Sequence, residues 1–530
     1  MTMSSSSHPA NNGIPLIATD LNSTRVRRLL IIGLGGRIRL KTRGKLTLAL
    51  LIFAVSFSVK ALVAVDLSPV MHTTAQVHGG MALRYHRDAV SIVEGRGLLV
   101  PDNWDSSDTQ LLARPPGYPI YLSAIYATLG KSYFNVQLVQ QVLNSISPIL
   151  IFLIAGRLLS WPVGVGTGLL AAVSHHLSYY SSFVLPDSIC ALPILLAIYL
   201  LVKTEHGTGR RWWVYAFAGL MIGLSVWLRP NSMLMGLFLA VMLTLISVRR
   251  RQVMKRAWLL AMTPFLVIAP ITIRNYLIFR EFIPISINTG IVLWEGIADG
   301  GGESFGAVGN DVLVAEQEAA LYNDPRYAES WSTPDGIKRD RERMRKSLWV
   351  IASHPIWFAG TMIRKMADML KYSAEAPLVF RATDTELVEA GADAKQVRDK
   401  SDEQEGWMSV RENSRLRSIA FGESIRWTRP LVRAVQRIAK ETMLLFVLLG
   451  GAIVLFLSAR RWLYIMMVPL YYLLIQSTMH TEFRYTLPMQ YFLFSFAAVV
   501  WVLLGFVAWH SAKLLARRRP KADKEVPSVV

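Results

Sequence analysis

Ten apolar blocks of roughly 17 to 24 residues limit the folds open to this chain of 530 residues. A bilayer core of about 30 Å is crossed by a helix of about 20 apolar residues, so each block predicts a transmembrane helix. The predicted fold is an all-α polytopic membrane protein, which excludes a soluble enzyme and a disordered chain. The blocks cover residues 46–65, 137–157, 162–178, 186–203, 212–229, 231–248, 257–274, 441–459, 462–479 and 486–509.

The charge of the short loops predicts how the helices are oriented. Lys and Arg number 57 against 37 Asp and Glu, a net charge of +20, and basic residues occupy every second connection. Because cytoplasmic loops are rich in Lys and Arg, both termini are predicted to be cytoplasmic, in a bacterial inner membrane. Nucleic acid is not needed to explain the excess. The cytoplasmic positions are Arg157, Lys203, Arg210, Arg211, Arg249–Arg251, Lys255, Arg256, Arg460, Arg461, Arg517–Arg519 and Lys521.

Two long segments are left on the outer side of this topology. The predicted units are a cytoplasmic tail (1–45), a membrane module (46–274) with an outer loop (66–136), an outer periplasmic domain of helical or mixed structure (275–440), C-terminal transmembrane helices (441–509) and a basic cytoplasmic tail (510–530). Residues 46–65 follow a basic stretch without a cleavage site and predict an uncleaved anchor. The short apolar stretch 117–129 predicts a helix at the outer interface rather than an eleventh span.

The first outer loop carries charged groups on a predicted short helix. Tyr85 and Ala89 share one face, Asp88 lies beside it, and glycines at 95 and 97 end the helix. Arg114 precedes two prolines that fix an extended backbone. A guanidinium held in this way suits bidentate recognition of a phosphate. Binding to lipid headgroups is the alternative.

Further polar residues fall at the outer ends of the predicted spans. Asp187 opens the fourth span, where it is either a substrate carboxylate or a helix N-cap. The stretch HTEFRYTLP either orients a charged headgroup or anchors the chain at the interface. Arginines on this side oppose the usual charge bias, which an anionic lipid-linked substrate would explain. The outer-face candidates are Arg114, Asp187, Arg229, Arg274, His480, Glu482, Arg484 and Tyr485.

Taken in order, these motifs resemble the GT-C glycosyltransferases, within them the protein O-mannosyltransferase and aminoarabinose-transferase branch. The residues that carry the resemblance are Arg84-Tyr85, RPPGYP (114–119), the acidic start of the fourth span, LRP (228–230), IRNYLIF (273–279), ISINTGIVLW (285–294), HPIWFAGTMIRK (354–365) and EFRYTLP (482–488). The resemblance implies an inverting enzyme that moves a sugar from a polyprenyl-phosphate carrier to a protein, lipid or glycan acceptor on the outer face.

The resemblance and the positions of the outer-face residues together predict roles for individual residues. The predicted catalytic residues are Asp88 and Asp187. The predicted donor-phosphate and carrier contacts are Arg114, Arg274, Arg484 and Tyr485. The predicted substrate-orienting residues are Tyr85, Arg229, His480 and Glu482. No cofactor is expected; His72, His78 and His86 lack metal-ligand spacing, which leaves a divalent metal as the minor alternative.

One position departs from the family pattern. The resemblance places a general-base Asp four residues before Tyr85, and this chain has Met81 there. Met cannot accept a proton, so either Asp88 or Asp66 has taken over, or the chain is inactive or altered at this site. Three alternative functions therefore stay open: a non-catalytic protein that binds the carrier lipid, a flippase or transporter of lipid-linked sugars, and a polysaccharide ligase or polymerase.

Overall fold

The computed structural model describes residues 27–35, 40–71, 77–101, 108–205, 212–247, 250–371 and 428–518. In this part of the chain the structure is nearly all-helical, which confirms the predicted fold class. The exception is one antiparallel pair of three-residue strands, β1 (Leu99–Pro101) and β2 (Asp108–Gln110). Parts of the predicted tails (1–26, 519–530), residues 372–427 of the predicted outer domain and the side chain of Asp66 lie outside the described residues.

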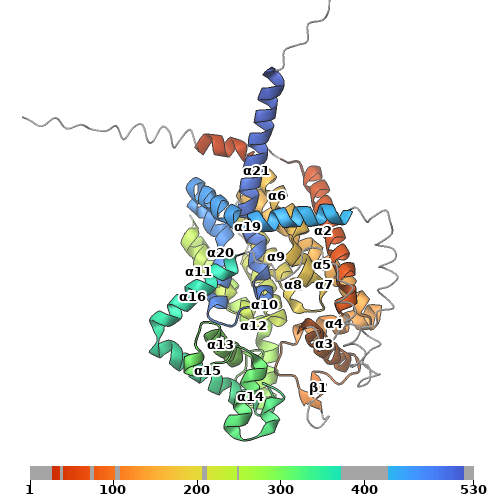
Figure 1. Cartoon of the computed structure of the whole chain (residues 1–530), viewed down its shortest axis with the longest axis vertical. Helices are drawn as coiled ribbons and strands as arrows, with labels where there is room; N and C mark the ends of the chain where they lie inside the picture. Colours follow the sequence, from red (N-terminus) through yellow and green to blue (C-terminus); the bar gives the residue numbers. More distant parts are fainter. Residues whose placement is uncertain are drawn as a thin grey trace, which may run out of the picture.

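The membrane-type helices gather in one bundle (Figure 1). Large apolar side chains fill its interior because the helices are apolar on most of their surface. The helices are α2 (Thr42–Met71), α5 (Tyr133–Leu158), α6 (Trp161–Val173), α7 (His175–Ser182), α8 (Pro186–Ile189), α9 (Ala191–Glu205), α10 (Trp212–Leu228), η1 (Pro230–Ser232), α11 (Met235–Ile246), α12 (Arg250–Phe279), α19 (Thr428–Leu457), α20 (Ala459–Ser477) and α21 (Leu487–Arg518).

Six of the described helices are long and apolar enough to cross a membrane, judged by length and composition. They fall on the predicted blocks 46–65, 137–157, 186–203, 257–274, 441–459 and 486–509. The other four predicted blocks also form helices, but these are shorter or less apolar. The block 162–178 is interrupted, because Ser174 ends α6 and its hydroxyl accepts a hydrogen bond from the backbone N–H of Leu177, which starts α7. The structure therefore supports a polytopic membrane protein without establishing ten crossings.

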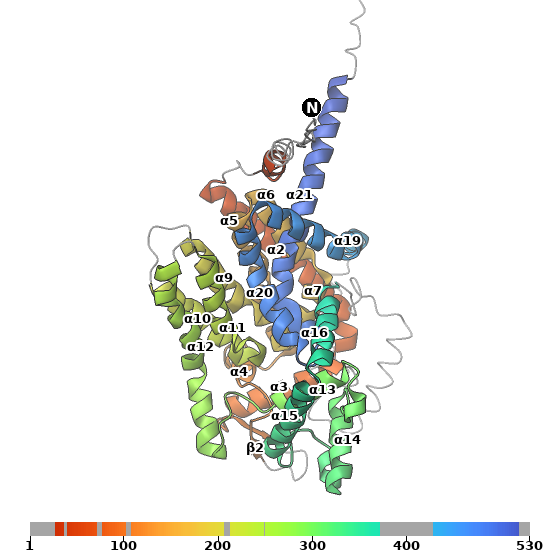
Figure 2. The ribbon, with the colours of Figure 1, turned by 90° about the vertical axis from the view of Figure 1, so that its left-hand side faces the viewer.

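Residues 77–101 and 108–129 of the first long segment and residues 280–353 of the second lie together at one end of the bundle (Figures 1 and 2), whereas residues 428–440 belong to α19. The described ends of the chain, near residue 27 and at the end of α21, lie at the opposite end. The first long segment forms α3 (Val77–Val93), the strand pair and α4 (Gly117–Leu129). The second forms α13 (Thr289–Ala298), η2 (Glu303–Phe305), α14 (Asp311–Tyr322), η3 (Pro325–Ala328), α15 (Gly336–Ser353) and α16 (Pro355–Leu370).

Local sequence explains how the first long segment is shaped. Helix α3 ends before Gly95 and Gly97, which have φ values of +78° and +74° that favour glycine. Helix α4 covers the predicted interfacial stretch 117–129. Its first residue, Gly117, packs so closely on the backbone of Trp227 in α10 that a Cβ atom would overlap the Trp227 carbonyl. These contacts fix the first long segment against the bundle.

Candidate functional site

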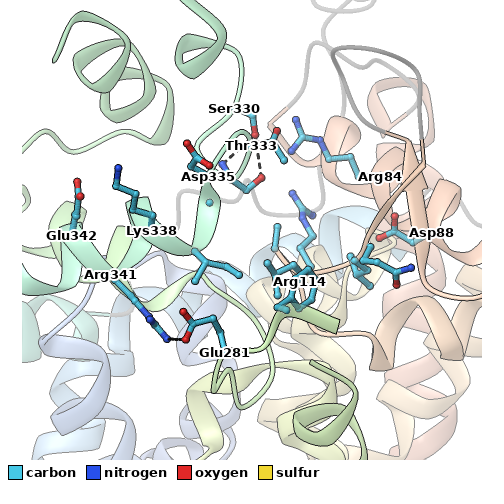
Figure 3. A pocket seen from close by; sticks show the side chains of 18 of the residues that line it. Arg84, Asp88, Arg114, Glu281, Ser330, Thr333, Asp335, Lys338, Arg341 and Glu342 are labelled. Atoms are coloured by element: carbon cyan, nitrogen blue, oxygen red, sulfur yellow. Dashed lines mark hydrogen bonds and ion pairs between the residues drawn. The ribbon is translucent and has the colours of Figure 1, made fainter. Parts of the chain in front are cut away.

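A cavity of about 780 Å³ lies between the two long segments. Arg84 and Arg114 extend from the first segment toward Thr333 and Asp335 of the second (Figure 3). Cationic side chains outnumber carboxylates in the described lining, so the cavity suits an anionic ligand. The cations are Arg84, Arg87, Arg114, Lys338, Arg341 and Arg345, and the carboxylates are Asp88, Glu281, Asp335 and Glu342. We call this space the interdomain cavity.

Asp88 is the buried carboxylate of this cavity. It lies on α3, and its side chain is only 6% exposed. Burial raises the pKa of Asp88 to about 7, against the opposing effect of Arg114, Arg84 and Arg87. A carboxyl group with this pKa exchanges a proton near neutral pH, as a general base must.

Arg114 is fixed at the edge of the same cavity. Its guanidinium carbon lies 5.0 Å from the centroid of the Tyr85 ring, a cation–π arrangement. Tyr85 is itself held in the core by an edge-to-face contact with Tyr118, at 5.0 Å between ring centroids. The hydroxyl of Tyr118 donates a hydrogen bond to Oε1 of Gln140 in α5. The bundle therefore positions Arg114 through two aromatic residues in edge-to-face contact.

A second group of predicted residues meets where α8, η1 and η5 (Phe483–Thr486) approach each other, and we call it the Asp187–Arg484 cluster. Asp187 forms an ion pair with Arg229. The Arg229 guanidinium lies 4.7 Å from the centroid of the Tyr485 ring. Glu482 accepts hydrogen bonds from Arg484 at 2.6 Å and from the Tyr485 hydroxyl at 2.9 Å. Five residues from three distant parts of the sequence thus form one charged cluster.

Asp187 does not act as the helix N-cap that its position allowed. The N-cap of α8 is Leu185, which makes no side-chain capping bond, and Asp187 lies within the first turn. Its side chain is 1% exposed, and its Oδ2 atom has no hydrogen-bond partner among the described residues. A buried carboxylate oxygen without a partner is costly, so one oxygen of Asp187 is left for a ligand.

Met81 lies at the edge of the Asp187–Arg484 cluster. Its Sδ atom is 3.6 Å from Nη1 of Arg484. The position where the resemblance expects a carboxylate is therefore inside the candidate site, although the side chain there is apolar. Tyr85, one turn further along α3, carries Arg114 on its ring and contributes to the electrostatics of Arg229, so it joins the cluster to the interdomain cavity.

Arg274 is committed to a different set of contacts. Its guanidinium donates hydrogen bonds to the Leu111 carbonyl at 2.8 Å and to Oε1 of Gln110 at 2.7 Å. Gln110 and Leu111 line the interdomain cavity, whereas Arg274 is outside its lining. In this structure Arg274 fixes the cavity wall.

His480 also lies in a network of its own. Its Nδ1 atom is 2.9 Å from Oδ2 of Asp299, and Lys365 approaches the same oxygen at 3.7 Å. The hydrogen bond with Asp299 raises the pKa of His480. Nearby, burial raises the pKa of Glu295 to about 7. This network ties α13 and α16 to the turn before η5.

The sequence does not predict the wall of the interdomain cavity that the second long segment contributes. Loop 330–335 and the start of α15 carry no motif, and only tertiary packing brings them opposite Arg114. The sequence does contain a signal for Arg84 and Arg87 as cavity residues, because they flank the candidate residues Tyr85 and Asp88 on one helix. Among the described residues no group of three or more His, Cys, Asp and Glu side chains could hold a metal ion.

A family model described as dolichyl-phosphate-mannose-protein mannosyltransferase matches residues 113–273. The resemblance to the protein O-mannosyltransferase branch is therefore confirmed for this segment, which is glycosyltransferase-like. The segment contains Arg114, Asp187 and Arg229, and leaves α3 and η5 outside. No curated protein matches the sequence.

Several solved membrane transferases are similar at low identity. An oligosaccharyltransferase of Archaeoglobus fulgidus in the apo form is 11% identical over 90% of this chain and 52% of its own, with a TM-score of 0.49. The oligosaccharyltransferase AglB from Archaeoglobus fulgidus, in complex with an inhibitory peptide and a dolichol-phosphate, is 11% identical over 91% of this chain and 52% of its own, with a TM-score of 0.48. ArnT from Cupriavidus metallidurans bound to undecaprenyl phosphate is 14% identical over 88% of this chain and 80% of its own, with a TM-score of 0.33. The chain spans about half the length of the oligosaccharyltransferase, and scores below 0.5 do not establish a common fold.

Proposed function

We propose that the chain is an integral membrane glycosyltransferase that moves a sugar from a polyprenyl-phosphate-linked donor to a lipid, glycan or protein acceptor, with inversion at the sugar carbon. The mannosyltransferase-type segment 113–273 supports the reaction class. The observation that carries the proposal is that Asp88, a buried carboxyl with a pKa of about 7, and Arg114 line one cationic cavity. A proton acceptor and a phosphate-binding cation are the two groups that this transfer needs.

Arg114 and Arg84 bind the donor phosphate in this proposal. Both guanidinium groups extend into the interdomain cavity from the first long segment (Figure 3). Guanidinium groups bind phosphate oxygens with paired, charge-assisted hydrogen bonds. They also stabilise the negative charge that grows on the phosphate as the glycosidic bond breaks, which lowers the barrier to transfer.

Asp88 acts as the general base. Its carboxylate takes the proton from the acceptor hydroxyl while the acceptor oxygen forms a bond to the sugar C1 atom. The bond between C1 and the phosphate oxygen breaks at the same time, and polyprenyl phosphate leaves with the electron pair. A single displacement of this kind inverts the configuration at C1.

The Asp187–Arg484 cluster holds the donor next to the base. Arg484 and Tyr485 contact the carrier, Arg229 and Glu482 orient it, and Asp187 keeps Arg229 in place through their ion pair. We assign Asp187 a second, catalytic task, since its unpartnered Oδ2 can accept a hydrogen bond from the reacting sugar. Arg274 and His480 serve the same site through the walls that they fix.

The proposed location is a bacterial inner membrane with cytoplasmic termini and an outward-facing site. Two observations support it: basic residues fill the short loops of one side, and the described chain ends lie at the bundle end opposite α3 and α15 (Figure 2), the helices that line the interdomain cavity. A carrier lipid embedded in the outer leaflet then reaches the cavity from the bundle side.

The contact between Met81 and Arg484 favours a second candidate, a protein that binds the carrier lipid without turnover. The two candidates separate in proteoliposomes that contain the full chain and a panel of undecaprenyl-phosphate-linked hexoses and pentoses. The enzyme releases undecaprenyl phosphate from at least one donor when an acceptor extract is present. Saturable donor binding without release from any donor would leave the second candidate.

A further inference from the structure

A second cavity, of about 760 Å³, lies within the second long segment, bounded by α13, α14 and α15. It is distinct from the interdomain cavity, since Arg345 is the one described residue that lines both. Three aromatic and three cationic side chains contribute to its lining: Trp294, Phe305, Trp349, Arg343, Arg345 and Lys346. We call it the aromatic cavity.

A buried guanidinium forms one wall of the aromatic cavity. Arg343 is 2% exposed, and its Nε and Nη2 atoms donate to Glu318 at 2.7 and 2.6 Å. Its Nη1 atom is buried and has no hydrogen-bond partner among the described residues. Glu318, the one carboxylate of the described lining, is further occupied by Arg339 at 2.6 Å. Two guanidinium groups therefore neutralise the one carboxylate, and the described lining keeps an excess of positive charge for an anion.

The aromatic walls are preformed. Trp294 is 5% exposed, whereas Trp349 is 64% exposed. Phe305 stacks on His354 at 4.7 Å and meets Trp357 edge to face at 5.1 Å between centroids. The adjoining loop is fixed to α14, because the side-chain amide of Gln317 donates a hydrogen bond to the Gly306 carbonyl at 3.0 Å. A ligand therefore meets a fixed apolar surface formed by Trp294 and Phe305, with the exposed Trp349 and the cationic side chains around it.

We propose that the aromatic cavity binds an acidic sugar residue, one that carries a carboxylate or a phosphate group, and that this sugar belongs to the acceptor glycan. The apolar C–H face of a sugar ring packs on an aromatic ring, whose face is electron-rich. The acidic group meets Arg343 inside the cavity, with Arg345 and Lys346 at its rim. An acyl chain would contact the aromatic side chains but would form no favourable interaction with the three cations. The mixed lining therefore favours a charged saccharide.

The acceptor role rests on the proposed glycosyltransferase function, whereas the binding of an acidic sugar does not. Helix α15 separates the two cavities, and Arg345 is common to both linings. A glycan chain held in the aromatic cavity can therefore extend past Arg345 toward Asp88. The cavity then sets acceptor specificity at a distance from the reacting hydroxyl.

Calorimetric titration of the detergent-purified full chain tests the binding. The probes are a galacturonate trisaccharide, a phosphorylated mannose disaccharide and neutral maltotriose; the first two distinguish carboxylate from phosphate. At least one acidic probe is expected to bind about tenfold more tightly than maltotriose. Trp349→Ala is expected to weaken that binding about tenfold, and Lys346→Gln about threefold with a smaller dependence on salt. Both positions are exposed, so folding is retained.

Leu348→Ala is the matched control, since Leu348 is 54% exposed on the same helix and does not line the cavity. Equal binding of acidic and neutral probes, or equal effects of Trp349→Ala and Leu348→Ala, would overturn the inference. The proposed function is read separately, by donor release. Acidic-sugar binding without donor release would support the sugar-binding site but contradict its acceptor role. Donor release without acidic-sugar binding would contradict this inference and leave the proposed function intact.

Discussion

The Sδ atom of Met81 lies 3.6 Å from Nη1 of Arg484, at the position where the resemblance predicts an aspartate. The nearest carboxylate on Arg484 is instead that of Glu482, at 2.6 Å. Asp88 follows Met81 by seven residues, which places it on the same face of α3, about 10 Å further along the helix axis. The base in our proposal has thus moved two turns along the helix and into the interdomain cavity.

A carboxylate restored at position 81 should not replace Asp88. Met81→Asp is expected to retain donor turnover within about threefold of the wild type, because Asp88 still accepts the proton. Asp88→Asn is expected to lose about 10² to 10⁴-fold, the usual contribution of a general base. The double variant, assayed by release of polyprenyl phosphate, is expected to stay inactive. Recovery of activity in the double variant would move the base back to position 81.

Arg114 is expected to control donor use. Arg114→Ala should lower kcat/KM for the donor about a hundredfold, since a guanidinium aimed at the leaving phosphate is lost. Arg114→Lys should recover only part of this, because an ammonium group cannot bind two phosphate oxygens as a fork. Arg326→Ala is the control, because Arg326 is 62% exposed and pairs with Asp324 away from the cavity. Similar losses in Arg114→Ala and Arg326→Ala would remove Arg114 from the phosphate site.

Activity is expected to rise with pH through about 7. Burial raises the pKa of Asp88 to about 7, so the carboxylate is protonated and inactive as a base at lower pH. The neighbouring Arg87 lowers this pKa, and Arg87→Gln should therefore move the midpoint of the kcat/KM profile to higher pH. Profiles of donor release between pH 5.5 and 9 measure the midpoints of both proteins. The difference between the two midpoints is expected to be of the size that removal of a single nearby charge causes. Activity that does not change between pH 5.5 and 9 in either protein would identify another base.

The Gly117 contact predicts a loss of stability without a direct effect on chemistry. Gly117→Ala should lower the free energy of unfolding by about 1–3 kcal/mol, because the new Cβ overlaps the Trp227 carbonyl and the backbone must shift. Gly360→Ala in α16 is the matched change, since a Cβ there meets nothing within 4 Å. It should be neutral or stabilising by about 0.5–1 kcal/mol. Thermal unfolding of the two purified variants in detergent compares them, and an equal change in both would contradict the packing argument.

The helices could be predicted from sequence wherever periodicity and length agree. The stretch 117–129 forms α4, and Gly95 and Gly97 follow the end of α3. The interruption at Ser174 could not be predicted, because a capping serine within an apolar block leaves the hydropathy unchanged. Helix α19 runs without a break from Thr428 to Leu457, across the predicted boundary between residues 440 and 441.

Site residues could be nominated from sequence, but their grouping could not. Asp187, Arg229 and Arg484 are each polar residues at the ends of predicted spans, and packing joins them in one cluster. Arg274 met the same criterion, yet its guanidinium is bound to Gln110 and Leu111. Direction of a side chain depends on tertiary contacts, which hydropathy and spacing do not encode. Tertiary contacts of the same kind bring loop 330–335 opposite Arg114, which the sequence pattern does not show.

Donor binding and donor turnover measured together on Asp88→Asn provide the most direct test of the proposed site. The titration uses an undecaprenyl-phosphate-linked sugar that the wild type turns over, and the release of undecaprenyl phosphate is followed in a single turnover. We expect the donor Kd to stay within about threefold of the wild type while the rate of release falls at least a hundredfold. Release at the wild-type rate by Asp88→Asn would contradict the assignment of Asp88 as the base of the interdomain cavity.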